Sequence, residues 1–338
     1  MKNYQMSRQR LSIIIMLFIS FAVLLALADR APMHLENRFT CVDLRTDVIT
    51  YVNGVTEVTS SGPYVYRVFI PYLATGINSV LPFISLVNLD LLLKIFFLIV
   101  CQLTFFYYLI NFFSDMLSLM GVFVLDILLG FTFSSIIGPS IGENADLLNL
   151  AVFILVLNAL YKNKFLIAVV FLFIGTFNRE TTLFLIPIIF MHDLILKKGM
   201  LRTVAALFAV AIPYIGLRMI IQPSVPDWFT FEALIKNIPL LSAKTTSSAV
   251  IANLHVAFLL LPLIVLSLLN FSQHPQFLRI AAYITPLFIL VHYLIGNIIE
   301  TRLWIPLFTI LIPLSLNTLS MILNNETQLS PTHQQAGK

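Results

Sequence analysis

The chain has 338 residues, of which 59% are hydrophobic and only 11% are charged, and its mean hydropathy is +0.95. Soluble globular domains carry about 25% charged residues, so this composition excludes a single water-soluble core. Long apolar runs without amphipathic alternation instead predict an all-α, polytopic transmembrane protein. The formal net charge of +4 says less than the places where the charges lie.

Ten apolar runs are candidate membrane spans, which predicts about ten crossings. The first run follows three basic residues, an arrangement typical of a signal anchor, although a signal peptide has a similar start. Three central runs are shorter than the roughly 20 residues that a helix needs to cross a bilayer, so they are expected to be tilted or re-entrant. The ten runs are Leu11–Ala28, Leu91–Phe113, Met116–Ile137, Leu147–Leu160, Phe165–Phe177, Thr181–Met191, Val204–Ile221, Val250–Leu269, Ile280–Ile298 and Leu303–Leu323.

The basic residues indicate how these runs are oriented. With the N-terminus in the cytoplasm, the inner segments carry ten basic residues against three acidic ones, whereas the outer segments carry fewer basic residues than acidic ones. This distribution follows the positive-inside rule. We therefore expect a multi-pass protein of the inner (plasma) membrane with both termini cytoplasmic. The same rule favours a hairpin within Phe165–Met191, with Asn178–Thr182 at its outer apex, over one long kinked helix.

The expected organisation is one transmembrane domain over residues 1–325, followed by a disordered cytoplasmic tail over residues 326–338. The first extracytoplasmic loop, residues 29–88, is the longest outer segment. Within it, Pro63–Phe83 is apolar and aromatic but is interrupted by one arginine and two prolines. This pattern predicts interfacial helices that lie along the membrane surface.

Charged and polar residues gather in four segments that this topology places on the outer side. An ionised side chain at the centre of a membrane helix costs at least about 2.5–3.5 kcal/mol, so such residues usually pair, line a wet cavity or take part in chemistry. Neighbouring residues point about 100° apart on a helix, so Arg179 and Glu180 should reach different partners. The candidate site residues are Asp43, Asp47, Tyr51, Tyr64 and Arg67 in the first loop, Glu143 and Asp146 after the third span, Asn178, Arg179 and Glu180 at the hairpin apex, and Asn297, Glu300 and Arg302 before the last span.

Two kinds of chemistry suit these residue types. A guanidinium fork binds two phosphate oxygens at once, which makes the arginines candidate phosphate ligands. A carboxylate at a wet membrane surface can act as a general base. Asp47 is the preferred base, because Tyr51 would share its face if this stretch is helical, and Asp43 is the alternative. Structural ion pairs, contacts with lipid headgroups and solvated loop charges explain the same residues without catalysis.

The order of these features resembles the GT-C superfamily of integral membrane glycosyltransferases: an N-in first helix, a long outer loop with an early aspartate and a following tyrosine, interfacial helices and many spans. The segments PYVYRVFIP (63–71) and FNRET (177–181) also resemble a set of bacterial multi-span proteins. The resemblance implies transfer of a sugar from a polyprenyl-phosphate carrier on the outer face. It assigns the acceptor proton to Asp47 or Asp43, and the carrier phosphate to Arg67, Arg179 and Arg302.

One departure from that pattern concerns the acids. Many relatives have paired acids in the first loop, whereas here Asp47 is followed by Val48, so the second acid could be Glu143, Asp146 or Glu180. No Cys/His cluster has zinc-like spacing, so no metal site is assigned. A divalent metal stays open because metal dependence varies across the superfamily.

The implied partners are a polyprenyl-phosphate-linked sugar, a glycan, lipid or protein acceptor, and membrane lipids, without nucleic acid. A cell-envelope glycan polymerase or a lipid-glycan flippase is the first alternative function. A secondary transporter, which should show an internal repeat and polar groups at the membrane midplane, or a non-enzymatic membrane subunit is the second.

Overall fold

The computed structural model describes residues 14–26, 44–60, 64–133, 143–221, 237, 247–296 and 300–328. In these residues all regular secondary structure is helical, as the composition predicts. After a helix at Ile14–Ala26, the main helices are α2 (Leu44–Thr56), α3 (Phe69–Val80), α4 (Leu86–Leu109), α5 (Asp115–Phe133), α6 (Glu143–Tyr161), α7 (Phe165–Asn178), α8 (Leu185–Ile195), α9 (Met200–Ile220), α11 (Ser247–Leu268), α12 (Gln276–Ala282), α13 (Ile284–Ile295) and α14 (Ile305–Gln328). Short 3-10 turns lie at Tyr64–Tyr66 (η1), Glu180–Phe184 (η2), Phe271–Gln273 (η4) and Thr301–Trp304 (η5).

Six stretches of the described chain are long and apolar enough to cross a membrane. They are Leu86–Leu109, Asp115–Phe133, Asn144–Tyr161, Met200–Ile220, Gln276–Ile295 and Thr301–Leu323. Three shorter apolar helices accompany them, at Ile14–Ala26, Phe165–Asn178 and Asn253–Leu268. The polytopic helical class is therefore supported, while the count of ten crossings stays a prediction.

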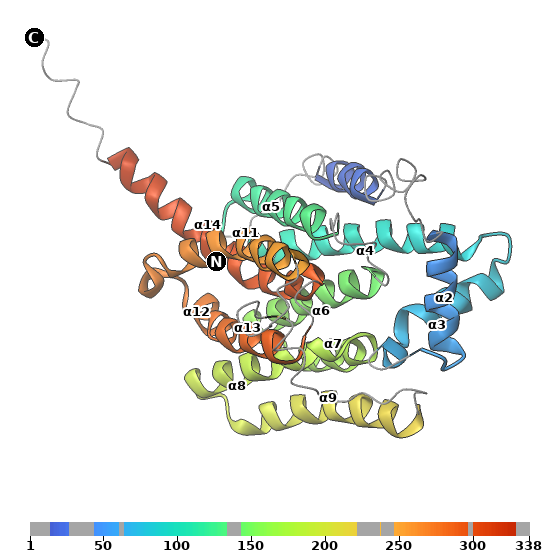
Figure 1. The fold of residues 1–338 in the computed structure, drawn as a ribbon. Coiled ribbons are helices and arrows are strands. Elements are labelled where there is room, and N and C mark those ends of the chain that lie inside the picture. Colours follow the sequence, from blue (N-terminus) through green and yellow to red (C-terminus); the bar gives the residue numbers. More distant parts are fainter. Residues whose placement is uncertain are drawn as a thin grey trace, which may run out of the picture.

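Helix α6 lies at the centre of the bundle. It packs against α4 on one side and α7 on another, and α14 also contacts it (Figure 1). Of its most apolar stretch, 78% of the residues are buried, compared with 17% for α9 at the edge of the bundle. A helix that is apolar all round belongs in an interior, whereas the exposed apolar side chains of α9, such as Leu201 and Phe208, suit contact with lipid.

Helices α2 and α3 lie at one end of the bundle, across the direction of the long helices (right in Figure 1). Helix α3 occupies most of the segment for which interfacial helices are predicted, and η1 precedes it. Its buried residues, including Ile70 and Ala74, pack into the main core. Helix α2 contacts both α3 and α4. The described part of the segment Pro63–Phe83 thus contains one α-helix and one 3-10 turn, and a position of interfacial helices at a membrane surface stays a prediction.

The chain reverses direction between α7 and α8. Helix α7 ends at Asn178 because Arg179 adopts an extended backbone conformation, and η2 then leads into α8. At the far ends of the two helices, Lys198 Nζ donates a hydrogen bond to Asn163 Oδ1. The two helices thus form a hairpin with its apex at η2, rather than one continuous helix. At the other end of the sequence, α14 continues to Gln328, three residues past the predicted domain boundary.

The hairpin depends on close packing at Gly175. A Cβ added there would lie 2.6 Å from Val152 Cγ1 on α6 and 3.1 Å from Thr182 Cγ2 in η2. We expect Gly175→Val to destabilise the protein by about 1–3 kcal/mol through overpacking, measured as a lower Tm in detergent. Gly216→Val on α9 is the matched control, because nothing lies within 4 Å of a Cβ added there. An equal Tm for both variants would contradict this packing.

Candidate functional site

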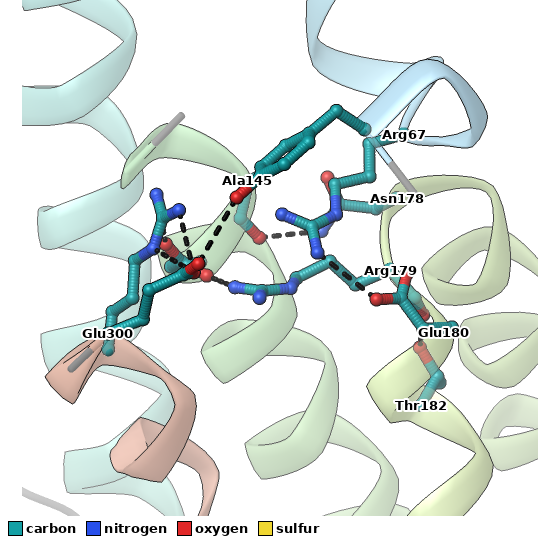
Figure 2. Close-up of polar contacts among 10 residues, drawn as sticks. Arg67, Ala145, Asn178, Arg179, Glu180, Thr182 and Glu300 are labelled. Carbon is teal, nitrogen blue, oxygen red and sulfur yellow. Dashed lines mark hydrogen bonds and ion pairs between the residues drawn. The ribbon is translucent and has the colours of Figure 1, made fainter. Parts of the chain in front are cut away.

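Four segments that are distant in the sequence meet at the end of the bundle where α2 and α3 lie. They are η1 with the residue after it, the start of α6, the α7–η2 junction, and the segment that enters η5. Figure 2 shows their polar side chains pointing toward one another. The meeting follows from chain direction, since α6 begins at this end and α7 ends there. We call these side chains the outer cluster, after the side of the membrane on which the sequence predicts them: Tyr64, Arg67, Asp146, Asn178, Arg179, Glu180, Glu300 and Arg302.

The most deeply buried contact in the outer cluster is an ion pair between Arg179 Nη1 and Asp146 Oδ1. Both side chains are only 2% exposed. Arg302 Nη1 lies 3.6 Å from the other oxygen of Asp146, so this carboxylate sits between two arginines. Asn178 Nδ2 donates to the Ala145 carbonyl at 2.6 Å. These contacts fasten the end of α7 to the start of α6.

Glu180 turns away from this pair toward Arg67. Its Oε1 accepts a hydrogen bond from Arg67 Nη2 at 3.1 Å, and its side chain is 29% exposed whereas that of Arg67 is 7% exposed. Burial raises the pKa of Glu180, but the charges of Arg67 and Arg179 outweigh burial and lower it to about 2. The carboxylate is therefore ionised at neutral pH. The extended backbone at Arg179 explains how two adjacent charged residues reach different partners.

Glu300 is held by more contacts than Glu180. Arg302 donates to Glu300 Oε2 from Nη2 at 2.9 Å and from Nε at 3.2 Å, and Tyr64 donates to Oε1 at 3.2 Å. Burial raises the pKa of Glu300, and Arg302 first among its neighbours outweighs burial and lowers it. The Tyr64 ring also lies 4.7 Å from the Arg67 guanidinium carbon. Tyr64 therefore contacts both the Arg302–Glu300 pair and the Arg67–Glu180 pair of the outer cluster.

A cavity of about 540 Å³ opens beside the outer cluster. One part of its wall is polar and includes Tyr64, Arg67, Glu180 and Glu300. The other part is mainly apolar, from Leu183, Phe184, Val291, Ile295 and Leu303. Arg179, Asp146 and Arg302 stand behind the polar wall, so Arg67 is the predicted phosphate ligand that reaches the cavity itself. The cavity is thus shaped for an amphiphile with a charged or polar head.

Several predicted site residues fall at or beyond the limits of the described structure. Asp43 and Asn297 lie outside the described residues, and the side chains of Asp47 and Glu143 also lie outside them. The backbone of Asp47 belongs to α2, so the helix expected for Asp47 and Tyr51 is present. The Tyr51 hydroxyl is buried and has no hydrogen-bond partner among the described residues. Burial raises its pKa, while Arg67, Arg179 and Arg302 act to lower it, which places Tyr51 within electrostatic reach of the outer cluster.

The structure adds residues that the sequence did not single out. Tyr214 lines the cavity from α9, and its ring lies 3.8 Å from the guanidinium carbon of Arg218. Arg218 also stacks on Tyr66, at 4.2 Å. The sequence feature that could have indicated these two residues is a tyrosine and an arginine four positions apart in an otherwise apolar run. His292 also lines the cavity, where it stacks on Phe288 and donates a hydrogen bond from Nδ1 to the Phe288 carbonyl.

Neither the described side chains nor comparisons with known proteins assign a metal site or a family to this chain. Among the described residues, no group of three or more His, Cys, Asp or Glu side chains is arranged to hold a metal ion. Glu180 and Glu300 are the carboxylates that line the cavity. No protein-family model matches the chain, and neither a curated protein nor a solved structure matches it. The resemblance to the GT-C superfamily therefore stays a prediction.

The pair Arg179–Asp146 should behave as one energetic unit. Removing one member of a buried ion pair leaves an unpaired buried charge and costs about 3–5 kcal/mol. We expect Arg179→Met and Asp146→Leu each to lower the Tm strongly, and the double variant to lose much less than the two single losses combined. A double-mutant cycle measures this coupling. Additive losses would contradict the pair.

Proposed function

We propose that this protein is a membrane glycosyltransferase that moves a sugar from a polyprenyl-phosphate carrier to an acceptor on the extracytoplasmic face. The observation that carries the proposal is the amphipathic cavity beside the outer cluster, with Arg67 in its polar wall. A lipid-linked sugar phosphate needs a cationic contact for its phosphate and an apolar contact for the start of its prenyl chain. Both contacts are present in one cavity.

The phosphate would bind at Arg67, with Arg179 and Arg302 behind the cavity wall. Preorganised cations around a leaving phosphate stabilise the negative charge that develops as its bond to the sugar breaks. Their effect is larger here than in water because all three arginines are buried and a less polar surrounding screens charge less. The three arginines are held in place by ion pairs with carboxylates, and Arg67 is the one that lines the cavity.

The acceptor hydroxyl needs a base. The sequence favours Asp47, which α2 brings one helical turn before Tyr51. The carboxylates in the cavity wall are Glu180 and Glu300. All three acids belong to elements at the same end of the bundle, so acceptor and carrier would meet there.

The proposed membrane is the inner (plasma) membrane, with the outer cluster on the extracytoplasmic side and both termini in the cytoplasm. The support is the charge distribution. The turns at the opposite end of the bundle, after α6 and after α8, carry the exposed basic residues Lys162, Lys164 and Lys197. Basic residues concentrate in cytoplasmic loops, so that end would face the cytosol.

Replacing Arg67 tests the function. Membranes that contain the protein would be incubated with radiolabelled polyprenyl-phosphate sugars. We expect Arg67→Ala to lower transfer by about 10²–10³-fold, the range for loss of one charge-stabilising donor. Glu57→Gln, an exposed change outside the outer cluster, should leave transfer intact. Carrier binding without transfer in the wild type would favour the polymerase or flippase alternative, and an active Arg67→Ala variant would contradict the proposed role of this arginine.

Sidedness can be measured separately. In a Cys41→Ser background, Thr59→Cys after α2 should react with a membrane-impermeant maleimide on intact cells. Lys162→Cys, which is exposed at the opposite end of the bundle, should react only after the cells are permeabilised. Cys101 is buried and should stay unlabelled in both variants. Labelling of Lys162→Cys on intact cells would reverse the proposed orientation.

A further inference from the structure

The two carboxylates in the cavity wall are held very differently. Glu300 receives three hydrogen bonds from two residues, Tyr64 and Arg302. Among the described residues, the side chain of Glu180 is held by a single guanidinium nitrogen of Arg67, although the exposed fractions of the two carboxylate side chains are similar, 29% for Glu180 and 26% for Glu300. The ion pair Arg67–Glu180 is therefore the contact of the outer cluster that a ligand in the cavity can break most readily.

Charge balance favours such a break, because two anions on one guanidinium repel each other. The outer cluster contains three arginines and three carboxylates, and its ion pairs join Arg67 to Glu180, Arg179 to Asp146, and Arg302 to both Asp146 and Glu300. A phosphate that enters the cavity meets Arg67 with a carboxylate already on it. Glu180 occupies Nη2 of Arg67, so a phosphate that binds at this nitrogen takes the place of the carboxylate.

We propose that Glu180 is an exchangeable partner of Arg67: the phosphate of the lipid-linked donor takes its place on the guanidinium, and the released carboxylate receives the proton of the acceptor hydroxyl. This inference rests on the proposed glycosyltransferase function and assigns the acceptor base to Glu180 rather than to Asp47.

The step balances. The acceptor oxygen forms a bond to the anomeric carbon of the sugar while the bond from that carbon to the phosphate oxygen breaks. The leaving phosphate keeps the electron pair and remains on Arg67, and the hydroxyl proton passes to Glu180. No oxidant, reductant or metal is required.

The exchange also raises the pKa of Glu180 when the donor binds. Without ligand, Arg67 is the first of the charges that keep the pKa of Glu180 low, which makes Glu180 a weak base. When the phosphate occupies Arg67, that influence is neutralised and a second negative charge lies nearby. Both changes raise the pKa of Glu180 and make it a better proton acceptor. Glu180 thus becomes more basic when the donor is bound.

The test compares binding with turnover in three matched variants: Glu180→Gln, Glu300→Gln and the exposed control Glu57→Gln. Affinity for a polyprenyl phosphate is measured on the purified full-length protein in nanodiscs, and sugar transfer is measured on the same samples. We expect Glu180→Gln to bind the polyprenyl phosphate about tenfold more tightly, since its competitor for Arg67 has lost its charge. The same variant should transfer sugar about 10²-fold or more slowly, because the base is gone.

The controls separate this role from a structural one. Glu57→Gln should change neither quantity, and Glu300→Gln should not gain affinity, because its carboxylate is bound to Arg302 rather than to Arg67. A purely structural Glu180 would lose affinity and transfer together. Affinity for the polyprenyl phosphate that is unchanged or weaker in Glu180→Gln would overturn the exchange while leaving the proposed function standing.

Two further outcomes distinguish the bases and the ligands. If Asp47→Asn abolishes transfer while Glu180→Gln transfers normally, the base is Asp47 and the inference is wrong.

Inorganic phosphate is the second probe, and we expect it to bind far more weakly than the lipid because it cannot use the apolar wall. Equal affinity for both probes would mean that the cavity takes free phosphate, which would overturn the proposed function but not the competition with Glu180. A wild-type protein that binds neither probe would overturn both.

Discussion

The buried ion pair between Arg179 and Asp146 is the constraint on which the rest of this end of the molecule depends. Two ions that are almost fully buried require each other, since neither can be solvated by water. Their contact fixes the end of α7 against the start of α6, and the hydrogen bond from Asn178 to the Ala145 carbonyl reinforces that junction. The extended backbone at Arg179 then sends Glu180 to the other side, toward Arg67 and the cavity.

The outer cluster is consequently built in two layers. The inner layer consists of Arg179, Asp146 and Arg302 and holds helices together. Arg302 forms ion pairs with both Asp146 and Glu300. The outer layer, Arg67 and Glu180 with Tyr64, faces the cavity. The inner layer gives the outer layer a fixed electrostatic environment, whereas the single hydrogen bond between Arg67 and the Glu180 side chain is a contact that can change. This division reconciles a structural role for most of the charges with the ligand-binding role that we propose for Arg67.

Much of this arrangement was predictable because charges in an apolar chain are few and must find partners. Sequence reasoning placed Arg179 and Glu180 at the apex of a hairpin with diverging partners, and it grouped both with Arg67, Asp146 and Glu300. It could not tell which arginine faces the cavity, because that depends on how η1 and η2 pack. It also did not single out Tyr214 and Arg218, whose spacing resembles that of ordinary lipid-facing residues. The number of membrane crossings does not follow from helix length alone, since α7 and α8 are short.

The central claim is that a lipid-linked phosphate binds in the cavity at Arg67, and a cryo-electron microscopy structure of the protein with a polyprenyl phosphate tests it most directly. The account predicts phosphate density within hydrogen-bonding distance of Arg67, about 3 Å, with Glu180 turned off the guanidinium and the prenyl chain against Phe184 and Ile295. A phosphate bound elsewhere, with the Arg67–Glu180 pair intact and the cavity unoccupied, would contradict it.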